Sequence, residues 1–213
     1  MKKTWTSFKA VLLLACPLAV LTACGNSGND TAANDSDTGT TGTHHTGTTM
    51  ATPATDTAGG RMAEATLSGT FADTAVNGTA RFERMDNGRV KMTLNLSVPK
   101  KANKSVAVHL HEHGSCADTA MAAGGHWNPT GANHGKWGEG QFHAGDIGNV
   151  KLDGQGNGTT ELETDLWSIG GDAQKNILNK TVMVHGGVDD YKSQPAGNSG
   201  KRIGCGVITV RNQ

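Results

Sequence analysis

Pairs and clusters of histidine mark the parts of this chain that could do chemistry. His109 and His111 stand two residues apart at the end of an alternating stretch, Ser105–His111. Successive side chains of a β-strand point to opposite faces, so both imidazoles would project from one face, with Val108 and Leu110 on the other. Two imidazoles on one face could begin a metal site, although two polar surface residues would fit the same pattern.

A glycine-rich stretch that follows offers a second set of ligands. It contains His126, His134 and His143, and after them the carboxylate of Asp146. Three histidines and one aspartate, with no cysteine among them, suit a tetrahedral zinc site. The glycines in this stretch allow the loop to fold tightly around an ion.

His185 ends a later apolar stretch and completes another possible site. Together with His109, His111 and His126 it would form an all-nitrogen ligand set, and nitrogen ligands around an open position suit Cu(II). His126 is then needed by both sets. One imidazole serves two ions only when both of its nitrogens are deprotonated, which makes His126 a candidate bridging imidazolate.

The segments that would have to position these residues read as short β-strands. In residues 90–98 every second side chain is apolar, as expected of a half-buried strand: Val90, Met92, Leu94, Leu96 and Val98. Further strands are expected at 65–71, 79–84, 105–111, 150–152, 159–164, 181–185 and 203–210, with Asn77-Gly78 as the turn between the first two.

Composition favours an all-β fold. The chain has 30 glycines among 213 residues, 4% aromatic and 18% charged residues, which is poor material for helices. We therefore predict an eight-stranded antiparallel Greek-key sandwich or barrel. Two long segments without a strand signal, 112–149 and 186–201, would carry the metal sites, since structureless segments of that length in a compact domain are usually functional.

The N-terminus has the features of a targeting segment. Lys2, Lys3 and Lys9 precede an apolar run, residues 10–21, that is too short to span a bilayer stably. The run ends in Leu21-Thr22-Ala23-Cys24, which resembles a bacterial lipobox. The resemblance implies cleavage before the cysteine and diacylation of its thiol, which gives stable membrane anchoring. An ordinary secretory signal with an incidental cysteine is the alternative.

These signals divide the chain into three parts. Residues 1–23 would be a lipoprotein signal peptide, residues 24–61 a disordered Thr- and Gly-rich tether that begins at lipidated Cys24, and residues 62–213 the folded domain. The protein would then be exported and held at a membrane, in the periplasm or at the cell surface. Its formal net charge of +0 offers no basic field for a nucleic-acid partner.

The cysteine count points to one disulfide. Cys16 would leave with the signal peptide and Cys24 would be lipidated, so Cys116 and Cys205 remain. In an exported and oxidising compartment these two should pair. Two free buried thiols are the alternative.

Four blocks of the sequence resemble the signature blocks of copper/zinc superoxide dismutases. They read HLHE at 109–112, GHWNP at 125–129, HAGD at 143–146 and GNSGKRIGCGV at 197–207. The resemblance covers roughly residues 63–211 and, with the lipobox, implies a bacterial lipoprotein form of the enzyme. It implies one copper and one zinc per chain, copper being held by His109, His111, His126 and His185 and zinc by His126, His134, His143 and Asp146.

The resemblance also implies roles for single residues. Arg202 would be the catalytic cation beside copper, and His126 would be catalytic as the bridge and as a proton donor. Asp189 would link ligands of the two metals. Cys116 and Cys205 would form the disulfide that this family has within its subunit.

The implied activity is the conversion of superoxide to dioxygen and hydrogen peroxide, as antioxidant defence outside the cytoplasm. Superoxide and, through lipidated Cys24, a membrane would be its partners. Related enzymes include monomers and dimers, so a homodimer is left open. His113, two residues after His111, is expected to be solvated rather than a ligand.

Two other functions fit parts of the sequence. A non-enzymatic copper- and zinc-binding lipoprotein of the same fold would be favoured by loss of a copper ligand or of Arg202, and neither is lost. An adhesive surface sandwich with incidental histidines would bind no metal in stoichiometric amount.

Overall fold

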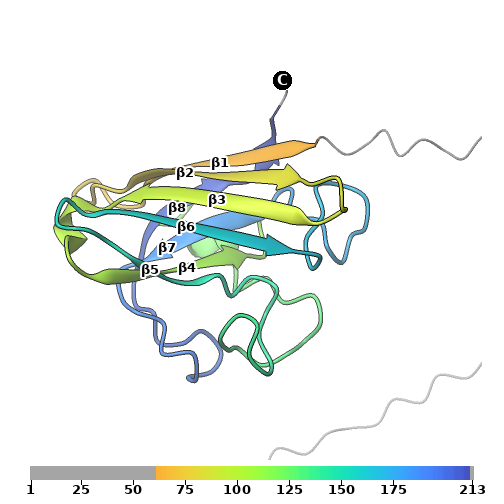
Figure 1. Ribbon diagram of the computed structural model, residues 1–213. Coiled ribbons are helices and arrows are strands. Elements are labelled where there is room, and N and C mark those ends of the chain that lie inside the picture. The colour runs from red at the N-terminus through yellow and green to blue at the C-terminus, as the bar shows by residue number, and fades with distance from the viewer. Residues whose placement is uncertain (1–60, 212–213) are drawn as a thin grey trace, which may run out of the picture. The chain divides into compact units, whose positions relative to one another are not determined.

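The computed structural model describes residues 61–211, which form one antiparallel sheet that curls into a nearly closed barrel (Figure 1). Its strands are β1 (Met62–Gly69), β2 (Asn77–Arg84), β3 (Val90–Ser97), β4 (Ser105–His111), β5 (Gly148–Lys151), β6 (Asn157–Thr164), β7 (Thr181–His185), β8 (Arg202–Val207) and β9 (Thr209–Val210). Two short 3₁₀ turns, η1 (Pro99–Lys101) and η2 (Met121–Ala123), are the only helical elements among the described residues. The prediction of an all-β fold is confirmed.

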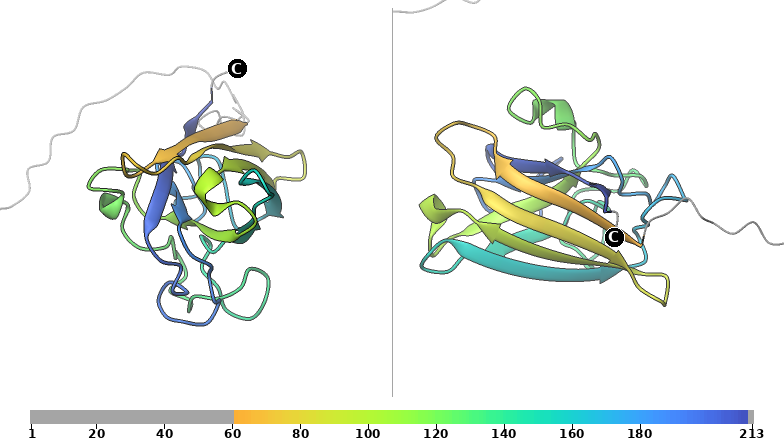
Figure 2. Two further views of the ribbon diagram at one scale, coloured as in Figure 1. Left: turned by 90° about the vertical axis from the view of Figure 1, so that its left-hand side faces the viewer. Right: turned by 90° about the horizontal axis from the view of Figure 1, so that it is seen from above.

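The strand order explains how the barrel nearly closes. Neighbouring strands follow the order β5-β4-β7-β8-β1-β2-β3-β6, and β9 pairs with β1. The connections from β3 to β4 and from β6 to β7 pass between strands that are not neighbours, as in a Greek key. The two edge strands, β5 and β6, are consecutive in sequence, so the turn between them brings the two edges together (Figure 2).

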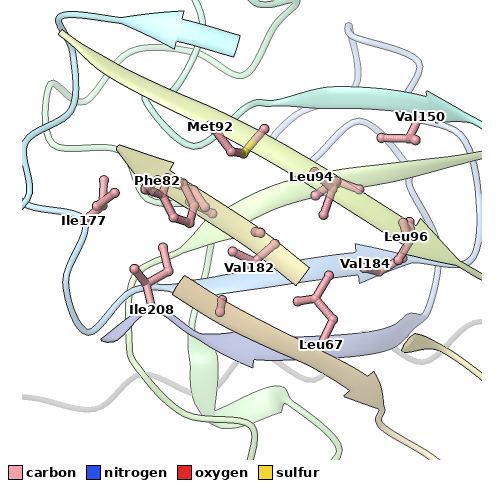
Figure 3. Packing of buried hydrophobic residues seen from close by; sticks show 14 of the residues in the cluster. Leu67, Phe82, Met92, Leu94, Leu96, Val150, Ile177, Val182, Val184 and Ile208 are labelled. Carbon is pink, nitrogen blue, oxygen red and sulfur yellow. The ribbon is translucent and has the colours of Figure 1, made fainter. Parts of the chain in front are cut away.

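The interior is filled by the alternating apolar residues that the sequence predicted. The five residues of the strongest pattern are all buried, at 0–3% exposure: Val90, Met92, Leu94, Leu96 and Val98. Figure 3 shows Met92 and Leu94 of β3 facing the same core as Val182 and Val184 of β7. The aromatic ring of Phe82 packs edge-on against another large core residue, Trp167, with 5.8 Å between ring centroids.

The predicted turn at Asn77-Gly78 is wrong. Both residues lie inside β2, where Gly78 pairs with Leu96, and the chain reverses earlier, in residues 70–76. A Cβ on Gly78 would lie 2.5 Å from the carbonyl oxygen of Asn95. Glycine is therefore needed here for the close approach of two strands, a requirement that looks the same in sequence as a turn.

The last predicted strand, 203–210, is interrupted. Buried Ile208 separates β8 from β9, and its backbone N–H donates to the carbonyl of Lys180 at 2.9 Å. Beyond this point the chain pairs with β1 alone. Pairing with β7 therefore ends at Val207, while pairing with β1 continues in β9.

The N-terminal predictions lie outside the described residues. These are the signal peptide at 1–23, the lipidated Cys24 and, apart from Arg61, the tether at 24–61. Within residues 61–211, no helix has the length and apolar character needed to cross a membrane.

Candidate metal centre

β4 presents two imidazoles on the face opposite the core. Val108 and Leu110 belong to the hydrophobic core, and alternation sends His109 and His111 to the other side. Both histidines are nevertheless almost fully buried, at 0% and 1% exposure. Two long loops, which lie side by side against this part of the barrel, cover them (Figure 1). We call residues 112–147 the first loop and residues 186–201 the second loop.

The loops complete two groups of possible metal ligands. In each group the four ligand atoms lie within 4.8 Å of one another, and every member is buried. The nitrogen group consists of His109, His111, His126 and His185, and the mixed group of His126, His134, His143 and Asp146. The structure thus brings together all seven residues that the sequence singled out, with His126 in both groups.

Hydrogen bonds fix which ring nitrogen of the nitrogen group is free. His111 donates from Nδ1 to the carbonyl of Gly124 at 2.9 Å, and His185 donates from Nδ1 to the carbonyl of Gly200 at 3.2 Å. A carbonyl oxygen can only accept, so Nδ1 carries the proton and Nε2 keeps its lone pair in both rings. In His109 the arrangement is reversed, because Nε2 lies 2.8 Å from a carboxylate oxygen of Asp189.

Two buried nitrogens of this group then have no protein partner. They are Nδ1 of His109 and Nε2 of His126, each without any hydrogen bond. A buried polar atom without a partner costs free energy. A metal ion bound between these two nitrogens would remove that cost. Four imidazoles whose ligand atoms lie this close together are a good ligand set for Cu(II).

The mixed group is organised around the carboxylate of Asp146. Its oxygens lie 2.9 Å from Nδ1 of His126, 3.0 Å from Nδ1 of His134 and 3.2 Å from Nδ1 of His143. The backbone N–H groups of Gly135 and His143 also donate to it, at 3.1 Å and 2.8 Å. Three imidazole nitrogens and one held carboxylate match the tetrahedral preference of zinc.

His126 faces both groups with different atoms. Its Nδ1 points to Asp146 and its orphan Nε2 to the nitrogen group. A second link between the groups is Asp189, whose two carboxylate oxygens accept from Nε2 of His109 at 2.8 Å and Nε2 of His134 at 2.9 Å. Such a carboxylate fixes the tautomer of both imidazoles and leaves their Nδ1 atoms free for metal.

Burial determines the protonation state of three members of the nitrogen group. It lowers the pKa of His109 to about 4, of His111 to about 2 and of His185 to about 3. Burial alone would raise the pKa of Asp146, but hydrogen bonds from His126, His143 and the backbone outweigh it and hold that pKa well below its usual range. At neutral pH these three imidazoles are therefore neutral and the carboxylate is ionised, as metal binding requires.

The same pKa values predict how the metal-free chain responds to acid. Below about pH 6.5 the three imidazoles protonate in the unfolded chain, while in the folded chain they stay neutral to about pH 4 or lower. Unfolding then takes up protons, so the free energy of unfolding should fall as pH drops from 6.5, by at most about 1.4 kcal/mol per pH unit for each histidine. Denaturant unfolding of the metal-free chain at pH 7.5 and 5 measures this. A free energy that stays constant over that range would contradict it.

A channel leads from the surface to the nitrogen group. It is a cavity of about 490 Å³ whose lining includes His111, His126, His185, Glu112, Gln194 and Arg202. The guanidinium of Arg202 donates to the carbonyls of Ala120 at 2.6 Å and Gly124 at 2.7 Å. Partial burial lowers the pKa of Arg202, but a guanidinium remains charged at neutral pH. The channel therefore holds a fixed positive charge suited to a small anion.

A disulfide fastens the first loop to the barrel. Cys116 in that loop and Cys205 in β8 are bonded, with 6.1 Å between their Cα atoms, so the predicted pairing is confirmed. The bond lies close in sequence to both sides of the Arg202 contacts. The accepting carbonyls of Ala120 and Gly124 flank η2, a few residues after Cys116, and Arg202 begins β8, which contains Cys205. The predicted solvation of His113 is also seen, because its side chain is 67% exposed and belongs to neither ligand group.

Several contributions to the site were missed by the sequence analysis. The carbonyl of Gly124 accepts hydrogen bonds from both His111 and Arg202. Every residue has a backbone carbonyl, so the residue type does not indicate which one will accept. Gly124 has a φ of +76° and a ψ of −154°, a backbone conformation that is essentially confined to glycine. Glu112 also lines the channel. Its position in the HLHE block, directly after His111, is the sequence feature that could have indicated this role.

Comparison with known proteins agrees with this geometry. A family model described as copper/zinc superoxide dismutase matches residues 76–208. The Cu-Zn superoxide dismutase of Talaromyces marneffei is 35% identical over 145 residues, covering 65% of this chain and 92% of that protein. A Cu-Zn superoxide dismutase of Aquifex aeolicus (strain VF5) is 42% identical over 111 residues, covering 50% of this chain and 64% of that one.

A solved structure shares the fold as well. The crystal structure of the clock protein EA4 superimposes with a TM-score of 0.63 at 28% sequence identity. The match covers 71% of this chain and 96% of that one.

Proposed function

The chain belongs to the copper/zinc superoxide dismutase family, and from that premise we propose that it works outside the cytoplasm as a bacterial lipoprotein anchored through Cys24. The activity itself follows from the family and the site: two molecules of superoxide and two protons become dioxygen and hydrogen peroxide. The observation that carries it is the sharing of His126 between two buried ligand groups. Copper, when bound, supplies the one-electron chemistry of this reaction.

The protein's own part begins with the copper ligands. His109, His111 and His185 are each held by a hydrogen bond through one ring nitrogen, which leaves the other free and correctly turned. His126 is the ligand that could also handle a proton. Its Nε2 has no protein partner and its ring lines the channel, so a proton held at this atom could be passed to a bound product.

Arg202 is proposed to draw the anionic substrate into the channel. Replacing it with isoleucine should slow dismutation about tenfold and weaken the dependence of the rate on ionic strength, since a positive field raises on-rates by about 10-fold to 10³-fold. Copper and zinc content should stay normal. Stopped-flow decay of superoxide at several salt concentrations, with metals assayed on the same sample, measures both effects.

The neighbouring Lys201 provides a matched control for this variant. It is exposed and is absent from the channel lining, so Lys201→Ile should leave the rate nearly unchanged. Equal slowing by both variants would mean that net charge matters rather than position. Loss of metal from Arg202→Ile would show that the guanidinium holds the loop through Ala120 and Gly124 instead of guiding substrate.

Sequence features support the proposed location. The basic start, the short apolar run and the LTAC tetrapeptide at 21–24 together have the order of a lipoprotein signal. The stretch from 25 to 60 is rich in Thr, Gly, Asn and Asp and has little to bury, as suits a tether between lipid and domain. A disulfide in the folded domain agrees with an oxidising compartment.

Detergent partition of the full chain expressed in a bacterial host tests the anchor. The wild-type chain should enter the detergent phase, carry dismutase activity there, and show a diacylated N-terminal Cys24 by mass spectrometry. Cys24→Ser should move the protein to the aqueous phase, whereas Cys16→Ser, a cysteine of the signal itself, should not. A Cys24→Ser chain that still partitions into detergent would contradict the lipoprotein assignment.

A further inference from the structure

Around the metal centre, carboxamide side chains hold the backbone of the loops through pairs of hydrogen bonds. Asn128, Asn149 and Gln194 each pair with both the backbone N–H and the backbone carbonyl of one other residue. Such a pair of hydrogen bonds imitates one rung of a β-ladder and fixes the backbone of the residue that it contacts. The pair of Asn128 lies within the first loop, where it closes on Ala132.

The other two pairs join the second loop to the rest of the site. Asn149 accepts from the N–H of Asp189 at 2.9 Å and donates to its carbonyl at 2.9 Å. Gln194, on the second loop, accepts from the N–H of His134 at 2.9 Å and donates to its carbonyl at 2.9 Å. The two residues that are held in this way are the linking carboxylate and a member of the mixed ligand group.

His134 is consequently held from several directions. Gln194 fixes its backbone on both sides, and Asp189 accepts from its Nε2 at 2.9 Å. These contacts turn Nδ1 toward Asp146, 3.0 Å away. None of them needs an ion, so the ligand is oriented by the protein alone.

The segment that carries Gln194 is itself well ordered. Asp190 accepts hydrogen bonds from the N–H groups of Lys192 and Ser193 and from the amide of Asn198, and its own N–H donates to the carbonyl of Gly197. Gly197 packs so tightly that a Cβ would lie 1.9 Å from a carboxylate oxygen of Asp189. Gln194 therefore projects from a rigid support, and its carboxamide can act as a fixed brace.

We propose that Gln194 is a positioning residue for zinc: by fixing the backbone of His134 before an ion binds, it sets how strongly the mixed group retains zinc. The proposal rests on the assignment of zinc to that group. Residues that orient metal ligands typically change metal affinity by about 10-fold to 100-fold when they are lost. Since Gln194 acts on one ligand of four, we expect an effect at the lower end of this range.

The test measures zinc binding by the metal-free full chain, using Zn(II) alone in competition with a chromophoric chelator. Gln194→Met keeps the length of the side chain and removes both hydrogen bonds, and it should raise the zinc dissociation constant about tenfold. Gln155→Met is the matched control, because Gln155 is exposed in the turn between β5 and β6, and it should leave zinc binding unchanged. Copper affinity should be nearly equal in all three chains.

A second readout separates positioning from general loosening. Co(II) bound in place of zinc should show an altered visible spectrum in Gln194→Met, because one ligand is less well oriented. If the methionine variant does not fold, Gln194→Ala, which places no long apolar side chain in the channel, is expected to show the same selective loss of zinc.

Three results would overturn the proposal. Zinc binding by the folded Gln194 variant with wild-type strength and wild-type Co(II) spectrum would show that the brace has no effect on the ligand. Equal weakening of zinc and copper would show that Gln194 only stabilises the fold. A wild-type chain that binds no zinc would overturn the zinc assignment itself and this proposal with it, so the two failures are distinguishable.

Discussion

Replacing His126 with alanine is expected to lower the rate of superoxide dismutation by about 10²-fold to 10⁴-fold, the range typical for loss of a positioned proton donor. The variant loses the one residue shared by the two ligand groups. The copper group keeps three imidazoles, and the zinc group keeps His134, His143 and Asp146. Zinc should therefore still bind, but more weakly, since the site has lost one of four ligands.

His113 supplies the matched control for this experiment. Its imidazole is close in sequence to the copper ligands, yet its side chain is 67% exposed and lies in neither group. His113→Ala should keep the wild-type rate and metal content. Stopped-flow superoxide decay, with copper and zinc assayed on the same samples, measures all three chains. A His126→Ala chain that turns over at the wild-type rate would refute the bridging role.

The ligands could be predicted from sequence because strand alternation and loop composition constrain them locally. His109 and His111 share a face since they are two apart in a strand, and their burial follows from the loops that must cover that face. His134 is different. The composition of the glycine-rich stretch suggests it as a ligand, but its position depends on Gln194, which lies 60 residues further along the chain and carries no such signal.

The parts that could not be predicted depend on contacts distant in sequence. The Asn77-Gly78 pair predicts a turn, but glycine is required at 78 by the carbonyl of Asn95 on the next strand. Asn149 and Gln194 carry no signal in sequence, since a carboxamide becomes a brace only when the backbone of another loop lies opposite. Backbone acceptors such as the carbonyl of Gly124 are invisible for the same reason.

Removing the disulfide with Cys205→Ser is expected to lower the free energy of unfolding by about 4.6 kcal/mol. The bond joins residues 89 positions apart, and closing a loop of that length restricts the unfolded chain by this amount in the chain-entropy estimate. Activity should fall too. The loop that Cys116 anchors carries Ala120 and Gly124, whose carbonyls hold the guanidinium of Arg202, so the fixed charge in the channel would lose its support.

Replacing the other cysteine of the bond, Cys116, provides an internal control for this prediction. Cys116→Ser should destabilise the metal-loaded chain by the same amount as Cys205→Ser, and the double variant should be no less stable than either single one, because all three lack the same bond. Denaturant unfolding measures the free energies, and the salt dependence of the dismutation rate reports on Arg202. If the single variants retain wild-type stability, the bond does not constrain the unfolded chain. If stability falls while the rate and its salt dependence stay normal, then the hydrogen bonds from Arg202 to Ala120 and Gly124 keep the charge in place without help from the disulfide.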